Sequence, residues 1–329
     1  MAFDIIVVGS TTQDVFVDTK NALFHNTGRQ DCVRVDFGSK ILVENIRFAV
    51  GGGAHNTAVN FQRMGFKTAV VSVVGNDTVG ATIQKTLAHE GIDTSFLVKK
   101  QGHSSYSLIL DSLGRERTIL AYKGVNDDLS LSDIALKKLD AAQCVYFSTM
   151  LGHSFNTQQK LILRMHARGI LTVFNPSYYL AAQGLSKLKK FLRSTNVLIF
   201  NREEASALSG ASSATPIEKI LRTLSQYGPQ HIIITDGRHP LFGYDSTFFY
   251  RLQPTPCHVV ETTGAGDAFA SSFTAAFLRG FPFDVCLCVG LAQSQSVITH
   301  SGATNRLLDW KTLMTLACSF RKRVGVYER

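Results

Sequence analysis

The sequence predicts an α/β fold: a large, mostly parallel sheet with helices on both faces, plus a small β-sheet lid. Short apolar runs alternate with helix-like segments along most of the chain, as in sheets built from strand–helix units. Two groups of short alternating runs interrupt this order and indicate inserted antiparallel strands. We therefore assign residues 1–14, 45–100 and 123–329 to a large domain and residues 15–44 and 101–122 to the lid.

The composition is that of a globular protein, with 45% hydrophobic and 18% charged residues in 329. The net charge of +9 suits an anionic ligand, but the positive residues are mostly scattered, so no nucleic-acid partner is expected. The six cysteines lack a paired metal-binding spacing, which favours reduced thiols in a cytoplasmic protein. We expect no signal peptide, and no apolar run approaches the roughly 18 residues of a membrane span.

The chain opens with a buried strand over residues 3–8, which Gly9 and Ser10 end. Asp14 follows closely, near the carboxyl edge of the sheet, where open α/β sheets bind ligands. A plain turn acid is the alternative interpretation.

A run of three glycines, Gly51-Gly52-Gly53, opens the first clear helix, which ends near Met64. Such glycines allow a ligand to approach the backbone, and Asn56 adds an amide in the first turn. The run is not GxGxxG, so a Rossmann dinucleotide site is disfavoured, and no GxxxxGK[ST] loop occurs. His55 could contact a ligand or be purely structural.

The rest of the chain continues the alternation of strands and helices. Further strands are expected at residues 68–74, 145–148, 170–174, 197–200 and 232–235, hairpins at 106–121 and 241–252, and helices at 79–90, 157–168, 185–193, 289–300 and 310–321.

An amide and a carboxylate, Asn201 and Glu204, follow one buried strand end with the spacing Asn-x-x-Glu. An opening helical turn brings both side chains to one face, where their oxygens could accept hydrated Mg²⁺. The alternative is that acids here only complement the helix dipole.

The stretch from Glu261 to Phe269 carries the strongest signal. Gly264-Ala265-Gly266 lies where a loop becomes a helix, and a helix start offers unpaired N–H groups to an anion. Asp267 points away from the stripe formed by Phe269, Phe273 and Phe277, so its carboxylate could face an open site. An anion cradle beside a proton acceptor suits phosphoryl transfer onto a hydroxyl. A tight turn with a first-turn acid is the alternative.

Together these motifs resemble those of the PfkB/ribokinase family of carbohydrate and nucleoside kinases, over nearly the full length of the chain. The glycine run with Asn56 is similar to the N-terminal signature of the family, and residues 262–267 to its C-terminal one. Asn201-x-x-Glu204, Asp14 and the late Gly302-Ala303 also match.

The resemblance implies a ribokinase-like fold and an enzyme that uses ATP and Mg²⁺ to phosphorylate a hydroxymethyl group. It implies that Asp267 is the base and that the backbone of Gly264, Ala265 and Gly266 holds the charge on the transferred group. It implies acceptor contacts from Asp14, Gly52, Gly53 and Asn56, nucleotide contacts from Thr235, Gly237, Gly302 and Ala303, and a magnesium site organised by Asn201 and Glu204.

Two departures and several alternatives stay open. The family usually has Asp where Glu261 stands, which leaves dependence on a monovalent cation such as K⁺ undecided, and His55 stands where many relatives carry a small residue. The acceptor could be a sugar or a nucleoside, and a non-catalytic ligand sensor is the alternative of another class. An exposed lid strand makes a homodimer through the lid a reasonable expectation.

Overall fold

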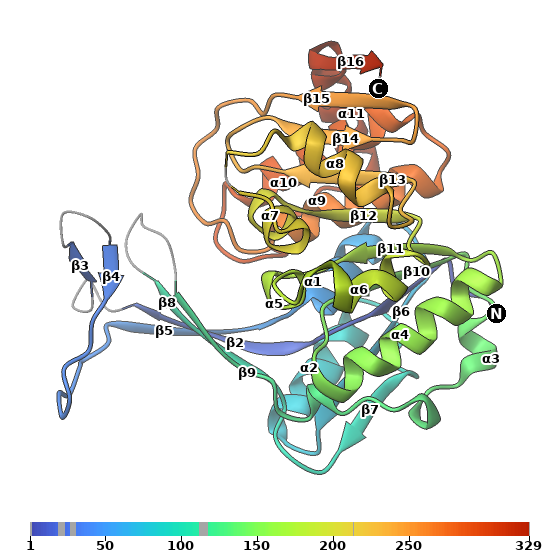
Figure 1. The fold of residues 1–329 in the computed structure, drawn as a ribbon. Coiled ribbons are helices and arrows are strands. Elements are labelled where there is room, and N and C mark those ends of the chain that lie inside the picture. Colours follow the sequence, from blue (N-terminus) through green and yellow to red (C-terminus); the bar gives the residue numbers. More distant parts are fainter. Residues whose placement is uncertain (1, 19–23, 27–30, 112–117, 213, 329) are drawn as a thin grey trace.

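A long sheet organises the large domain (Figure 1). The computed structural model describes residues 2–18, 24–26, 31–111, 118–212 and 214–328. Within these residues the spatial order of the strands is β16 (Val324–Glu328), β15 (Phe248–Leu252), β14 (Leu241–Tyr244), β13 (His231–Thr235), β12 (Val197–Asn201), β11 (Leu171–Asn175), β10 (Cys144–Ser148), β1 (Ile5–Val8), β6 (Thr68–Gly75) and β7 (Leu97–Lys100). Neighbours from β13 to β7 are parallel, and β14, β15 and β16 add an antiparallel edge.

The sheet is covered on both faces because its central strands are apolar throughout. In β1, Ile5 and Val7 face one core while Ile6 and Val8 face the other, as the two-residue period of a strand requires. One face packs against α1 (Gly53–Arg63), α2 (Thr78–His89), α9 (Ala265–Leu278), α10 (Phe283–Val297) and α11 (Trp310–Phe320). The other packs against α3 (Leu136–Leu139), α4 (Gly152–Ala167), α5 (Tyr178–Ala181), α6 (Gly184–Leu192), α7 (Arg202–Ser209) and α8 (Ile217–Ser225).

This architecture confirms the predicted α/β fold. The predicted stripe of α9 is also present: Phe269 and Phe273 are buried, with ring centroids 6.5 Å apart. Helix α10 begins at Phe283 rather than at residue 289, because Pro282 provides a helix start that the apolar periodicity alone did not reveal. Helix α8 and strands β7 and β16 were not predicted.

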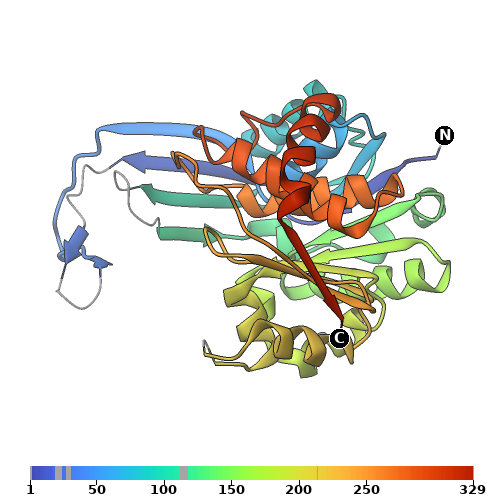
Figure 2. The same ribbon diagram turned by 90° about the horizontal axis from the view of Figure 1, so that it is seen from above.

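A small four-stranded sheet projects from the large domain (Figure 2). Its order is β5 (Asn45–Gly51), β2 (Thr12–Asp18), β8 (Tyr106–Asp111) and β9 (Thr118–Tyr122), with β2 and β8 parallel and the outer pairs antiparallel. Two short strands, β3 (Phe24–Asn26) and β4 (Asp31–Val33), form a separate hairpin-like pair.

The small sheet differs from the predicted lid in its boundaries. One of the two groups of alternating apolar residues comprises Val33, Val35, Phe37, Ile41 and Val43. Only Val33 of this group lies in a strand, β4, and the strand that joins the small sheet is β5. Pairing with β2 sets this register, since Asp18 lies opposite Asn45 and Thr12 opposite Gly51. Residues 12–14 and 45–51, assigned above to the large domain, therefore belong to the small sheet. The turn of the predicted 106–121 hairpin, residues 112–117, lies outside the described residues.

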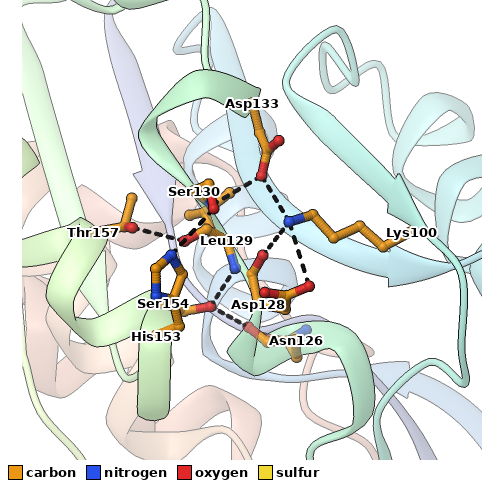
Figure 3. A network of polar contacts seen from close by, with 9 residues as sticks. All are labelled: Lys100, Asn126, Asp128, Leu129, Ser130, Asp133, His153, Ser154 and Thr157. Atoms are coloured by element: carbon orange, nitrogen blue, oxygen red, sulfur yellow. Dashed lines mark hydrogen bonds and ion pairs between the residues drawn. The ribbon is translucent and has the colours of Figure 1, made fainter.

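The segment that follows the small sheet is tied to the large domain by a polar network (Figure 3). It contains the 3₁₀ turns η1 (Gly124–Asp127) and η2 (Leu131–Asp133). Ser154 of α4 donates to the carbonyl oxygen of Asn126 and accepts from the amide of Leu129, both at 2.7 Å. Lys100 of β7 forms ion pairs with Asp128 and Asp133 at 3.4 and 3.0 Å. These contacts hold the chain at the point where it leaves β9.

Among the described residues, no helix has both the length and the apolar character needed to span a membrane. Five of the cysteines are free thiols. Cys144, Cys286 and Cys288 are buried as expected for core thiols, whereas Cys257 and Cys318 are exposed.

Candidate active site

A cavity of about 540 Å³ opens at the carboxyl ends of the central strands, where the sequence placed the ligand edge. It is bounded by Ser10 after β1, Ser148 of β10, Asn175 of β11 and Thr235 of β13. Six residues of the small sheet complete its wall: Thr12, Asp14, Ser107, Ile109, Ile119 and Ala121. The cavity therefore lies between the two sheets.

The start of α9 forms one side of this cavity. Gly264 precedes the helix with φ of +78°, a left-handed conformation, and a Cβ there would lie 2.5 Å from the Cβ of Ala303. Only glycine fits both conditions. Asp267 lies in the first helical turn and lines the cavity, together with Gly264 and Gly266. The first N–H groups of the helix have no partner one turn earlier within it, so this end can hold an anion.

Two polar contacts, one helical turn apart on each helix, join α9 to α1. Asn56 Nδ2 donates to Asp267 Oδ2 at 2.8 Å, and Asn60 Nδ2 donates to Ser271 Oγ at 2.7 Å. Because both contacts are spaced by four residues on both helices, α1 and α9 run side by side in the same direction. Both helix starts therefore face the cavity.

The amide of Asn56 is itself held from behind. His55 Nδ1 lies 3.2 Å from Asn56 Oδ1, and the His55 side chain is buried, which lowers its pKa and favours the neutral ring. A neutral ring that donates from Nδ1 orients the amide so that its NH₂ group faces Asp267. In this structure His55 therefore lies behind Asn56 and is not among the residues that line the cavity.

The carboxyl group of Asp267 is electrostatically unusual. Burial raises its pKa to about 6, the hydrogen bond from Asn56 works against this shift, and the charge of Asp14 adds to it. Its partner is a neutral amide rather than a cation. A carboxylate with a pKa near neutrality, beside a cavity, is suited to accept a proton.

Asp14 reaches the cavity from β2 of the small sheet. Its side chain is buried, and Thr12 Oγ1 donates to its Oδ1 at 2.7 Å. A Cβ on Gly51 would lie 1.9 Å from Asp14 Oδ2, so the carboxylate and the glycine run are in close contact. Gly52, Gly53 and Asn56 line the same cavity. The structure thus brings together the predicted acceptor residues with Asp267.

Asn201 and Glu204 also line the cavity, but they hydrogen-bond to each other. Asn201 Oδ1 accepts a hydrogen bond from the backbone N–H of Glu204 at 2.8 Å, and Glu204 Oε2 accepts one from the backbone N–H of Asn201 at 2.9 Å. The two bonds form a capping box at the start of α7. Burial raises the pKa of Glu204 to about 7, and the charge of Asp267 contributes. The Asn201 side-chain oxygen therefore already accepts a hydrogen bond, and no ion pair to Glu204 is found among the residues that the structure describes.

Glu261 is held on the far side of Gly264. Ser301 Oγ and the Gly302 amide donate to its Oε2 at 2.7 and 3.0 Å, and Arg47 Nη2 lies 3.5 Å from the same oxygen. Burial opposes ionisation, but these donors and the Arg47 charge hold the pKa of Glu261 below its ordinary value. Gly302 is thereby fixed beside Ala303, which contacts Gly264.

Four of the predicted site residues do not border the cavity directly. Gly302 and Ala303 lie behind Gly264, and Gly237 lies on the loop after Thr235, next to Asp236, which pairs with Arg202 at 3.1 Å. Ala265, whose backbone opens α9, is likewise not a lining residue.

The residues that sequence reasoning missed include Lys123 and Ser148, which line the cavity, and Arg47 and Asn60, which contact predicted site residues or their helix. The Ser148 hydroxyl is buried, without a hydrogen-bond partner among the described residues, and it lines the cavity. The sequence did contain one signal for Ser148: it lies at the end of a buried strand, and the same kind of position led to the prediction of Asn201 as a site residue. Arg47 lies within β5, which was not predicted as a strand, and Lys123 directly follows β9, the second strand of the predicted 106–121 hairpin.

Comparison with known proteins decides the family. Residues 3–310 match the family described as pfkB family carbohydrate kinase. The chain belongs to the PfkB family. PfkB members are ATP-dependent kinases that phosphorylate sugars and nucleosides.

Relatives and solved structures agree with this membership. A ribokinase of Haemophilus influenzae is 26% identical over 82% of this chain and 88% of its own length. The structure of Arabidopsis thaliana ribokinase complexed with ribose and ATP has a TM-score of 0.81 at 20% identity, covering 96% of this chain and 99% of that one. A putative ribokinase II from E. coli, in complex with ATP and Mg²⁺, has a TM-score of 0.78 at 16% identity and covers 97% and 100%. These structures show that the PfkB chain has the ribokinase-like fold expected from its sequence.

The raised pKa of Asp267 predicts how stability depends on pH. The unfolded carboxyl ionises near pH 3.8 and the folded one near pH 6, so ionisation increasingly destabilises the folded state between these values. Replacing Asp267 by Asn should remove this effect. The Asp267→Asn variant should gain stability over wild type as pH rises from about 4 to about 6, reaching on the order of 3 kcal/mol and staying constant above that.

Urea denaturation at several pH values measures this difference. Asp36→Asn, which removes an exposed loop carboxylate, is the control and should show no such rise. A stability difference for Asp267→Asn that is the same at every pH would contradict the assigned environment.

Proposed function

We propose that this PfkB chain transfers the γ-phosphoryl group of ATP to a hydroxymethyl group of a sugar or sugar-like acceptor. One observation carries the proposal: the Asp267 carboxylate faces the cavity in the first turn of a glycine-started helix, and its partner is a neutral amide. An ion pair would have lowered its pKa and its basicity.

In the proposed reaction, the acceptor hydroxyl lies beside Asp267. Its oxygen attacks the γ-phosphorus of ATP, its proton passes to an Asp267 carboxylate oxygen, and the bond to the bridging oxygen breaks to release ADP. The N–H groups at the start of α9, around Gly264, Ala265 and Gly266, stabilise the charge on the transferred group. Asp14, Gly52, Gly53, Asn56 and Ser148 surround the acceptor.

The nucleotide occupies the side of the cavity that Thr235 borders. We propose that Gly302 and Ala303 shape this side by packing behind Gly264, and that Gly237 lies near the base. The small sheet, which contributes six cavity residues, is proposed to act as a lid that excludes water from the transfer.

The residues fit a magnesium ion held largely by phosphate and water. The described residues contain no group of three or more His, Cys, Asp or Glu side chains able to hold a metal. Mg²⁺ commonly uses one or two carboxylates together with substrate phosphates and water. Burial and the charge of Asp267 both disfavour the ionised form of Glu204, so Glu204 is the carboxylate that such an ion would stabilise. The hydrogen bond between the Asn201 backbone N–H and Glu204 would orient this carboxylate. The ion would supply neutralisation of phosphate charge.

We propose that no monovalent cation is needed at Glu261. Its Oε2 atom already has two hydrogen-bond donors, and the guanidinium of Arg47 supplies a positive charge from the lid. Arg47 also stacks over the Phe16 ring at 3.9 Å, which fixes its position.

We propose that the protein is cytoplasmic and acts on a small molecule. Buried free thiols support a cytoplasmic protein, and the scattered positive residues support a small-molecule acceptor rather than a nucleic acid.

We propose a homodimer through the lid. The register places Ile46, Phe48 and Leu120 on the sheet face opposite the cavity, and each is more than one-third exposed.

Replacing Asp267 by Asn should reduce kcat by about 10²–10⁴-fold, because the variant keeps the shape of the site but cannot accept the proton. A coupled assay of ADP release, with ribose, fructose, adenosine, inosine and cytidine as acceptors, measures this and separates sugar from nucleoside kinases. Near-normal turnover by Asp267→Asn would remove the base assignment. Tight acceptor binding by calorimetry with no ADP release would favour a ligand sensor instead.

Placing a charge on the outer face of the lid should weaken the dimer. Phe48→Asp should raise the dimer Kd by about 10–100-fold, the effect of losing a buried aromatic anchor. Light scattering across a concentration series measures the mass of each variant. Leu163→Asp, an equally drastic change at an exposed apolar position of α4, is the control. A monomeric wild type, or an unaffected Phe48→Asp dimer, would contradict the proposed interface.

A further inference from the structure

The cavity contains one cation that the proposed phosphoryl transfer does not use. Among the described residues that line it, three are carboxylic acids (Asp14, Glu204 and Asp267), and Lys123 is the only one with a basic side chain. The lysine follows directly after β9, where the small sheet returns to the large domain.

The backbone around Lys123 is firmly placed. The buried side chain of Asn126 donates through Nδ2 to the carbonyl oxygens of Thr11 and Val73 at 3.1 and 3.0 Å. The backbone N–H of Asn126 donates to the Lys123 carbonyl oxygen at 3.1 Å. The same Asn126 belongs to the network of Figure 3, which ties this segment to α4. The Lys123 side chain therefore extends toward the cavity from a backbone that these hydrogen bonds hold in place.

The Lys123 ammonium feels the charges of nearby acids but is not in ion-pair contact with any residue that the structure describes. Within the described residues, no hydrogen bond or ion pair involves Lys123 Nζ, and its side-chain contact is with the Tyr179 ring, whose centroid lies 5.4 Å away. Burial lowers its pKa, and the charges of Asp127 and Asp14 offset only part of this effect. A partly buried ammonium without a paired anion costs free energy that a bound anion would recover.

A neighbouring lysine shows the contrast. Lys100, on the other side of the η1 turn, forms ion pairs with Asp128 and Asp133, as Figure 3 shows. Asp127, the acid nearest to Lys123 in sequence, instead accepts a hydrogen bond from the Leu151 amide at 3.3 Å. The chain thus pairs the lysine outside the cavity and leaves the one inside available.

We propose that the acceptor carries an anionic group, a carboxylate or a phosphate, in addition to its reacting hydroxyl, and that Lys123 binds this group. The inference rests on the proposed kinase function and names the substrate class for it. The anion lies between Lys123 and Tyr179, with the Ser107 hydroxyl on the same wall. Asp14 and Asp267 would bind hydroxyls, which carry no charge that these two carboxylates would repel.

The alternative role for Lys123 is to balance the charges of Asp14 and Asp127. The two roles differ in their consequences. A counter-ion would affect every acceptor alike, whereas an anion-binding residue affects charged acceptors selectively.

The test compares acceptors that differ in charge, using the full chain and the ADP assay. Ribose and fructose are the neutral acceptors; fructose 6-phosphate is the phosphate arm, and 2-keto-3-deoxygluconate is the carboxylate arm. Wild type should prefer one of the anionic acceptors by kcat/KM. In Lys123→Met, the ratio of anionic to neutral kcat/KM should fall by about 10–100-fold, the size of one charge-assisted hydrogen bond.

Two control variants and two further measurements distinguish the possible outcomes. Lys123→Arg, which keeps the charge, should retain the anionic preference, and Lys99→Met, an exposed lysine of β7, should not change it. Calorimetric binding of the preferred anionic acceptor should weaken in Lys123→Met and not in Lys99→Met, which gives a readout apart from turnover. Thermal unfolding of each variant shows whether it is folded.

A wild type that prefers neutral sugars, or a Lys123→Met variant with an unchanged acceptor ratio, would overturn this inference while leaving the kinase proposal intact. If wild-type protein releases ADP no faster than Asp267→Asn with every acceptor, both this inference and the kinase proposal are overturned.

Discussion

The parallel alignment of α1 and α9 is the constraint on which the rest of the site depends. Asn56 meets Asp267 and Asn60 meets Ser271, one helical turn apart on each helix. The second contact is buried and is supported by Gln293 of α10, whose Nε2 donates to Asn60 Oδ1 at 2.8 Å. A buried polar contact is satisfied in only one register, so it specifies how the helices lie. That register delivers two glycine-rich helix starts, from opposite ends of the sequence, to the same cavity.

The site concentrates negative charge that the fold alone would not favour. Asp14, Glu204 and Asp267 share one cavity, and the pKa values of Glu204 and Asp267 are raised to about 7 and about 6. Structural carboxylates of the same chain behave differently: Asp140 is paired with Arg164 at 2.6 Å, and its pKa is lowered. The negative charge gathered in the cavity fits a site completed by the positive charge of a metal ion and by hydroxyl donors of an acceptor. In this view Lys123 gives the same cavity a place for one anion.

Much of this could be predicted from the sequence, because the signals were local. The Gly264–Asp267 turn and the phenylalanine stripe behind it follow from helix periodicity, and both are as expected in the structure. The Asn60–Ser271 contact was not predictable, since nothing in either helix alone indicates the other as its partner. Strand β5 was misplaced because register depends on β2, and the roles of Arg47 and Lys123 depend on that register. For Asn201 and Glu204 the sequence offered a magnesium site or acids that complement the helix dipole, and it did not indicate the capping box. The structure shows that helix capping and cavity lining coexist.

The central claim is that the aligned helix starts set the basicity of Asp267 through Asn56. The pH dependence of kcat/KM, measured for wild type and for Asn56→Ala, tests it most directly, because this quantity reports ionisations of the free enzyme. The account predicts that wild-type activity falls below an apparent pKa near 6, since Asp267 must be ionised to accept a proton. Removing the Asn56 amide removes a stabiliser of the carboxylate, so the fall should move to higher pH in the variant. An acid limb that is absent, or that stays at the same pH in both proteins, would contradict the account.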